Sequence, residues 1–189
     1  MSAIRTFLSF SPPPEVRESM RLLQERLKTS QADVRWEQPD QFHATLKFLG
    51  DVSPETMPRV LSSVRAAAAA GGPFPVTFQA LGCFPSSRAP KVVWIGCEAG
   101  DGSLEGLKER LDAALLGLGF LVEGRAFRPH VTLGRVRSGR MLQHLTPMLE
   151  KCIFEPRIAL VDRIFVMKSV LTPQGAEHSA IEAIQLEAS

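Results

Sequence analysis

The tetrad His-x-Thr-Leu occurs twice in the chain, as HATL at residues 43–46 and as HVTL at residues 130–133. In a β-strand, residues two positions apart project from the same face, so each histidine shares a face with its threonine. The two leucines then point to the opposite face and can enter a core. Two such strands facing each other would bring two imidazoles and two hydroxyls into one cleft. The repeat therefore predicts two similar lobes around one shared site.

The elements around the tetrads also follow a repeated order. Apolar periodicity and turn residues predict strand-helix-strand-helix-strand in each half of the chain. Helices are expected at 15–28, 53–70, 103–118 and 139–151, and strands at 4–10, 34–36, 41–49, 74–81, 91–97, 128–136, 158–171 and 180–186. Residues 172–177 should form a loop. No linker separates the halves, so we expect an α+β fold with residues 1–189 as a single bilobal domain.

Two helix starts carry a serine that can act as an N-cap. Ser53 precedes Pro54, and Ser103 follows a Gly-Asp-Gly turn. In the helix expected at 103–118, apolar residues recur every three or four positions on one face. They are Leu104, Leu107, Leu111 and Leu115. This spacing predicts an amphipathic helix with a buried leucine stripe.

The paired histidines, His43 and His130, suit acid-base chemistry. Imidazole titrates near neutrality, so one ring can accept a proton while the other donates one. In-line cleavage of a phosphodiester needs such a pair, and threonine hydroxyls can stabilise charge on the non-bridging oxygens. A single histidine is more often a hydrogen-bonded core residue, but the repetition with threonine in register favours catalysis. A zinc site would need a third ligand, which neither tetrad has at a suitable spacing, so we expect no metal or other cofactor.

The charge of the chain is informative only locally. Lys and Arg number 22 and Asp and Glu 20, so a net charge of +2 gives no global basic field toward nucleic acid. However, a stretch without acidic residues holds five arginines. They are Arg125, Arg128, Arg135, Arg137 and Arg140. The stretch is either a phosphate-binding patch or a solvated surface, and we favour phosphate binding for the two that flank the second tetrad, Arg128 and Arg135.

The cysteines and the chain ends point to a reducing compartment. Cys83, Cys97 and Cys152 are odd in number and match no zinc spacing, which favours reduced thiols over a disulfide framework. Residues 1–10 lack the long apolar run of a signal peptide, and no apolar stretch could span a membrane. We therefore expect a cytoplasmic protein without a membrane partner.

The motifs resemble those of a known superfamily. Residues 43–50 (HATLKFLG) and 128–135 (RPHVTLGR) are similar to the two signature strands of the two-histidine (2H) phosphoesterases. The match is closest to the RNA 2′,3′-cyclic phosphodiesterase branch, also called LigT-like or 2′-5′ RNA ligase. Further matches cover nearly the whole chain. They include VRW at 34–36, GCFPS at 82–86, VWIG at 93–96 and SVLTPQG at 169–175.

The resemblance implies a fold and a set of site residues. Each lobe would be an antiparallel sheet with helices on its outer face, and the two would face each other across a central cleft. His43 and His130 would be catalytic, and Thr45, Thr132 and Arg128 would bind phosphate. Relatives often carry a tyrosine shortly after the last loop, where this chain, which has no tyrosine, has His178.

Three more residues are candidates for contact with RNA. Arg135 flanks the second tetrad. Strand alternation places Lys47 on the face of His43 and Thr45, where it could meet phosphate or simply emerge at the strand end. Phe48 points the other way by alternation and core packing is its commoner fate, although the resemblance implies that its ring holds a nucleobase. His144 and His178 have no motif and no assigned task.

These observations predict a metal-independent RNA 2′,3′-cyclic phosphodiesterase. The resemblance implies opening of the cyclic phosphate to a 2′-phosphate, with O3′ leaving, and the reverse reaction would join a 5′-hydroxyl end in a 2′-5′ bond. The alternatives are a small cyclic nucleotide or 2′-5′ oligonucleotide as substrate, or a non-catalytic protein that binds RNA ends. We expect a monomer whose partner is an RNA end or a cyclic nucleotide. The sequence does not assign the acid and the base between the two histidines.

Overall fold

The computed structural model describes residues 2–172 and 175–187. The strands are β1 (Ile4–Phe10), β2 (Val34–Trp36), β3 (Ala44–Val52), β4 (Phe74–Phe84), β5 (Val92–Glu98), β6 (His130–Val136), β7 (Arg157–Val161), β8 (Arg163–Thr172) and β9 (Gly175–Gln185). The helices are α1 (Pro14–Lys28), α2 (Met57–Ala69), α3 (Ser103–Leu116) and α4 (Leu142–Lys151), with a 3₁₀ turn, η1, at Pro39–Gln41. No helix within the described residues is long and apolar enough to cross a membrane.

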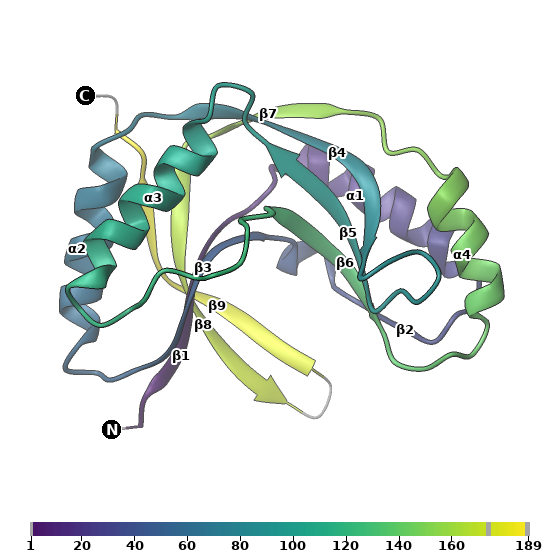
Figure 1. Ribbon diagram of the computed structural model, residues 1–189, viewed down its shortest axis with the longest axis horizontal. Coiled ribbons are helices and arrows are strands. Elements are labelled where there is room, and N and C mark those ends of the chain that lie inside the picture. The colour runs from purple at the N-terminus through teal and green to yellow at the C-terminus, as the bar shows by residue number, and fades with distance from the viewer. Residues whose placement is uncertain (1, 173–174, 188–189) are drawn as a thin grey trace.

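The strands form one continuous, curled antiparallel sheet with two halves (Figure 1). Its order is β7-β4-β5-β6-β3-β1-β8-β9, and β2 pairs with β6. The halves meet where β3 lies beside β6, and the pair Ala44 and Val131 joins them. Helices α2 and α3 cover one half and α1 and α4 the other, so the expectation of an α+β fold with two lobes and outer helices is confirmed (Figure 1).

The lobes do not coincide with the two halves of the sequence. Strands β1 and β3 pair with each other and continue into β8 and β9 from the far end of the chain. Helix α1 follows β1 in sequence but lies over the other lobe, beside α4. Its buried Gln24 donates hydrogen bonds from Nε2 to the carbonyl oxygens of Glu37 and Leu133, which ties α1 to the strands of that lobe. The two lobes are therefore interleaved along the chain.

The predicted apolar faces are buried. Leu46 and Leu133 lie in the core, as strand alternation requires. The leucine stripe of α3 is fully buried, and in α1 the residues Val16, Met20, Leu23 and Leu27 face the sheet. The period of 3.6 residues thus correctly identified which side of each helix faces the core.

Several element boundaries differ from the prediction. Helix α2 begins at Met57 rather than near Ser53, because a turn comes first in which the Ser53 hydroxyl accepts a hydrogen bond from the Thr56 N–H. Ser103 is the first residue of α3 rather than its cap. The cap position is Gly102, whose φ of 78° is a left-handed conformation that glycine adopts readily. The loop expected at 172–177 is shorter, since β8 runs to Thr172 and β9 begins at Gly175, and residues 173–174 lie outside the described part.

Candidate active site

The two tetrads lie side by side at the junction of the lobes. Ala44 and Val131 are directly opposite each other on antiparallel strands and are fully buried. One step in opposite directions along the strands places His43 beside Thr132 and Thr45 beside His130. Because neighbouring side chains alternate between faces, these four residues project away from the core. An approximate twofold relation therefore pairs each imidazole with the hydroxyl of the other strand.

The four side chains line one cavity of about 520 Å³, a size typical of small-ligand sites. Thr6, Phe7, Gln41, Phe48, Gly50, Ser169, Leu171 and Ala176 also line it. Its charged and titratable lining residues, besides the paired histidines, are Arg5, Arg35, Glu37, Arg135 and His178. Three arginines against one carboxylate make the cavity suited to a phosphate group.

Both catalytic candidates are held in the same way. Nδ1 of His43 lies 2.7 Å from the Gln41 carbonyl oxygen, and Nδ1 of His130 lies 2.7 Å from the Arg128 carbonyl oxygen. A carbonyl oxygen can only accept, so each Nδ1 must carry the proton of this hydrogen bond. In the neutral ring Nε2 is then unprotonated and can accept a proton, and in the charged ring it can donate one. Each imidazole is thus oriented for proton transfer through Nε2.

Aromatic side chains surround each imidazole. The His43 ring lies 5.0 Å from Phe7 and 5.2 Å from His178, measured between centroids. The His130 ring meets Phe84 edge-on at 5.1 Å. Burial lowers the pKa of both catalytic candidates below the usual histidine value, and the Coulomb effect of Arg135 acts in the same direction. At neutral pH, the unliganded site therefore favours neutral rings.

The predicted orientations of Lys47 and Phe48 are wrong, because β3 contains a β-bulge. In its pairing with β1, Ser9 lies opposite Thr45 but Leu8 lies opposite Lys47, so Leu46 is an extra residue. The bulge reverses the alternation for Lys47 and Phe48, and a second register shift follows at Leu49. Lys47 is only 1% exposed, whereas Phe48 is 62% exposed and lines the cavity.

Lys47 is part of a buried ion cluster rather than the cleft. Its Nζ lies 2.6 Å from Asp112 Oδ1 on α3 and donates to the Leu121 carbonyl oxygen at 2.8 Å. Lys108 pairs with the other oxygen of the same carboxylate. Burial raises the pKa of Asp112, but the hydrogen bonds from Lys108 and Lys47 outweigh it, and the net shift is downward. The cluster fastens the bulge of β3 to α3 and removes Lys47 from the set of RNA contacts.

The five arginines of the predicted patch do not lie together at the site. Arg135 lines the main cavity and its Nε lies 3.5 Å from Glu37 Oε1. Arg128 is exposed and lines a second, smaller cavity instead, so the structure does not place it with the two threonines. Its main-chain carbonyl is nevertheless the group that holds His130. Arg125, Arg137 and Arg140 line neither cavity.

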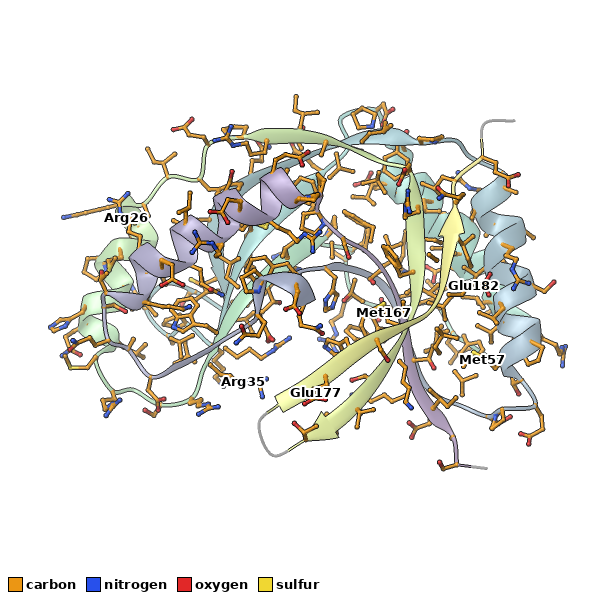
Figure 2. All side chains as sticks on the ribbon, turned by 180° about the vertical axis from the view of Figure 1, so that it is seen from behind. Arg26, Arg35, Met57, Met167, Glu177 and Glu182 are labelled. Atoms are coloured by element: carbon orange, nitrogen blue, oxygen red, sulfur yellow. The ribbon has the colours of Figure 1, made fainter. Side chains whose placement is uncertain are left out.

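Sequence reasoning missed Arg5 and Arg35, and it left His178 without a role. Arg35 lies on β2 beside the tip of the β8–β9 hairpin, where its Nη1 is 2.8 Å from the position that a Cβ on Gly175 would take. Figure 2 shows Arg35 near the end of this hairpin, whose strand β9 carries Glu177. The hairpin also brings His178 to His43, and burial, together with the charges of His43 and Arg135, lowers the pKa of His178 to about 4. Only the strand position of Arg5 and Arg35 could have signalled their orientation, and alternation alone does not say which face borders a cleft.

Among the described residues, no three His, Cys, Asp or Glu side chains come close enough together to hold a metal ion. The groups that line the main cavity include the imidazoles of His43 and His130, two threonine hydroxyls and three guanidinium groups. Paired antiparallel strands that present two imidazoles and two hydroxyls to such a cavity are the arrangement that the sequence led us to expect of a two-histidine phosphoesterase.

Comparison with known proteins identifies the family. The model described as "LigT like Phosphoesterase" matches twice, at residues 10–94 and 95–176. The RNA 2′,3′-cyclic phosphodiesterase of Methanothermobacter thermautotrophicus is 31% identical over 184 residues, which cover 97% of this chain and 99% of that protein. The enzyme of the same name from Aquifex aeolicus is 28% identical over 192 residues, covering 98% of this chain and 99% of that protein. This chain belongs to the LigT-like phosphoesterase family.

Solved structures share the fold. The Thermus thermophilus protein TT0787 superposes with a TM-score of 0.81 at 24% identity, over 97% of this chain and 98% of that one. The LigT protein of E. coli, in its apo form, gives a TM-score of 0.75 at 23% identity with full coverage of both chains. E. coli LigT has also been solved in complex with 3′-AMP.

Proposed function

We propose that this protein hydrolyses the 2′,3′-cyclic phosphate at an RNA end to a 2′-phosphate, without a metal ion. The observation that carries the proposal is the pair of imidazoles fixed through Nδ1, each beside the threonine of the opposite strand, in one arginine-lined cavity. The names of the relatives support the substrate class. Since both lobes contribute lining residues to one cavity, we propose that residues 1–189 act as one bilobal unit, and we propose that this unit is a monomer.

The reaction would be an in-line displacement at phosphorus. One Nε2 takes a proton from water as its oxygen attacks phosphorus, and the P–O3′ bond breaks. The other Nε2 gives its proton to the departing O3′, so the two rings exchange protonation states. Thr45, Thr132 and Arg135 would donate hydrogen bonds to the non-bridging oxygens, where negative charge increases in the transition state. The approximate twofold symmetry leaves the assignment of acid and base open.

Product analysis tests this proposal directly. An RNA that ends in a 2′,3′-cyclic phosphate is incubated with the protein in EDTA, and the product is identified by ³¹P NMR. A 2′-monophosphate formed at an undiminished rate is the expected result. A 3′-phosphate would contradict the proposed leaving group, and activity that is lost in EDTA and restored by a divalent metal would contradict the metal-independent mechanism.

The pH dependence of kcat/KM follows from the burial of the two rings. Burial lowers the pKa of His43 and of His130, so each ring becomes protonated at a lower pH than an ordinary histidine does. The reaction needs one ring protonated and the other neutral, which gives a bell-shaped profile. For a nucleoside 2′,3′-cyclic monophosphate, we expect its maximum below about pH 6.5, the ordinary histidine pKa. A rate that keeps rising toward pH 9 would contradict two-histidine catalysis.

Phe48 is proposed to stack on the terminal nucleobase, because its ring is exposed inside the cavity, 6.0 Å from Phe7. Replacing Phe48 by alanine should lower kcat/KM about tenfold, since stacking of one base on one aromatic ring contributes about 1–3 kcal/mol. Steady-state kinetics measures this. Leu160→Ala is the control, because Leu160 is 63% exposed on β7 and outside the cavity. An equal effect of both substitutions would argue against stacking.

The same site could also join two RNA ends. A 5′-hydroxyl oxygen would then attack the cyclic phosphate in place of water, lose its proton to one imidazole and form a 2′-5′ bond as O3′ takes a proton from the other. This second activity needs room for another nucleoside beside the catalytic rings. A cavity that borders His130 from the other side favours it.

A further inference from the structure

A second cavity of about 260 Å³ adjoins the active site. It is lined by Gln79, Ala80, Phe84, Trp94, Gly96, Cys97, Glu98, Arg128, Pro129 and His130. His130 lines both cavities, so its ring stands between them. Whatever occupies the second cavity therefore lies next to a catalytic side chain, on the side away from Phe48 and the main cavity.

The wall of the second cavity is aromatic. Phe84 and Trp94 lie with their centroids 4.9 Å apart and their planes 36° apart, and both rings lie near His130. The Trp94 ring lies on the bare backbone of Gly82, where a Cβ would collide with the indole. Glycine at this position therefore lets the indole lie flat on β4, and a larger residue there would displace it. Such rings are typical platforms for nucleobases.

The rim of the second cavity is polar. Arg128 is exposed, and its side chain forms no ion pair with the described residues. Gln79 Nε2 donates a hydrogen bond to Glu98 Oε1 across the rim between β4 and β5. An amide and a carboxylate can bond to the edges of a base, and a guanidinium can bond to a phosphate in two-point fashion. An aromatic wall with these groups matches a nucleoside joined to a phosphate.

We propose that the second cavity binds a second nucleoside of the substrate, with Arg128 on its phosphate. This inference rests on the proposed function. With the terminal nucleoside on Phe48 and its cyclic phosphate between the imidazoles, the adjoining nucleoside lies past His130 and against Trp94. Two sources share this chemistry: the penultimate nucleotide of an RNA end, and the nucleotide whose 5′-hydroxyl attacks in the joining reaction. A contact between Arg128 and the phosphate of this second nucleoside, rather than the cyclic phosphate, accounts for the position of Arg128 outside the main cavity.

The test compares three reactions of the wild-type protein and of the variants Arg128→Gln and Gln79→Ala. They are hydrolysis of a nucleoside 2′,3′-cyclic monophosphate, hydrolysis of a dinucleotide that ends in a 2′,3′-cyclic phosphate, and joining of the cyclic monophosphate to a nucleoside 3′-phosphate with a free 5′-hydroxyl. The measured quantity is kcat/KM for each two-nucleoside reaction divided by that for hydrolysis of the monophosphate. Arg137→Gln is the control, since Arg137 is an exposed arginine that lines neither cavity.

We expect Arg128→Gln to lower this ratio about tenfold in at least one of the two reactions, since the variant loses a charge-assisted hydrogen bond to the phosphate. Gln79→Ala should lower it less, and Arg137→Gln should leave it unchanged. A drop with the cyclic dinucleotide identifies the penultimate nucleotide as the occupant, and a drop in joining identifies the attacking nucleoside. If the ratios of Arg128→Gln equal those of the wild type in both reactions, the inference is overturned. A wild-type protein that hydrolyses neither cyclic phosphate would instead overturn the proposed function.

Discussion

Replacing His130 by alanine is expected to lower kcat for cyclic phosphate hydrolysis about a thousandfold, within the range of 10²–10⁴ that one general acid or base contributes. The ring is held by a single hydrogen bond to the Arg128 carbonyl and lies beside Thr45 on the neighbouring strand. Of the other imidazoles that line the cavity, His43 is proposed to take the opposite role in the same step, and His178 packs against His43. Single-turnover hydrolysis of an RNA with a 2′,3′-cyclic phosphate end measures the loss of the chemical step.

Binding should survive the same substitution. The arginines, threonines and Phe48 of the main cavity are untouched, so the dissociation constant for a 2′-nucleotide product should change by only a few-fold. His144→Ala is the matched control, because His144 is exposed on α4 and lies outside both cavities. A protein that only binds RNA ends would show no hydrolysis in either form, and the substitution would change only its affinity. If His130→Ala keeps a kcat within tenfold of the wild type, two-histidine catalysis is refuted.

The corresponding change at His43 sharpens the test. Because the two rings act in one step, the double variant should be about as slow as the slower single variant rather than the product of both losses. Multiplicative losses would show that the rings act independently.

Replacing Asp112 by asparagine is expected to lower the free energy of unfolding by about 3–5 kcal/mol, the usual cost of removing one partner from a buried ion pair. Asp112 bonds to both Lys47 and Lys108, and these lysine side chains are 0% and 8% exposed. The neutral amide would leave buried Lys47 without a counter-charge, and Lys108 with only Glu123, whose Oε2 lies 3.9 Å from its Nζ. Urea unfolding followed by circular dichroism measures the change.

The order of effects within the cluster distinguishes this account from simple packing. Lys47→Met should cost less than Asp112→Asn, because Asp112 keeps Lys108 as a partner. Lys168→Met, at an exposed position on β8, is the control and should change stability by less than about 0.5 kcal/mol. Equal losses in Lys47→Met and Asp112→Asn would contradict the shared carboxylate.

The contribution of Asp112 also has a defined pH window. Its pKa is lower in the folded protein than in the unfolded chain, so the unfolded state binds the proton more readily. The stabilisation is complete above the unfolded pKa of about 3.9 and is lost as the pH falls through the lower folded value. The asparagine variant should lack this part of the acid dependence.

The four central site residues could be predicted from the sequence because their placement depends on local geometry. The period of two along a strand joins each histidine to its threonine, and the repetition indicates that both pairs belong to one site. The helix faces were predictable for the same reason, since the period of 3.6 is a property of the chain alone. Element ends were less predictable: Ser53 sits in a turn before α2, and Gly102 takes the cap position expected of Ser103.

The wrong orientations predicted for Lys47 and Phe48, and the position of Arg128 at the second cavity, have a different origin. A bulge arises from how β3 pairs with β1, and its position depends on the partner strand as much as on β3 itself. Likewise, Arg128 lies two residues before His130 in sequence, but its side chain lines the second cavity and not the main one. Which cavity it lines depends on how the surrounding strands pack. Arg5 and His178 reach the site from strands distant in sequence, and His178 arrives only because β9 pairs with β8. Arg35 is near His43 in sequence, but its place depends on the pairing of β2 with β6.

The amino-acid sequence by itself determined which histidines and threonines share a face, the α+β class and the buried faces of α1 and α3, since each depends on periodicities within a single segment. The tertiary structure alone decided that the lobes interleave, that Lys47 is structural while Phe48 faces the cavity, and that His130 borders a second cavity. These features depend on pairing between strands that are distant in sequence. The register of such a pair depends on both strands together, so it cannot be predicted from the pattern of one strand alone.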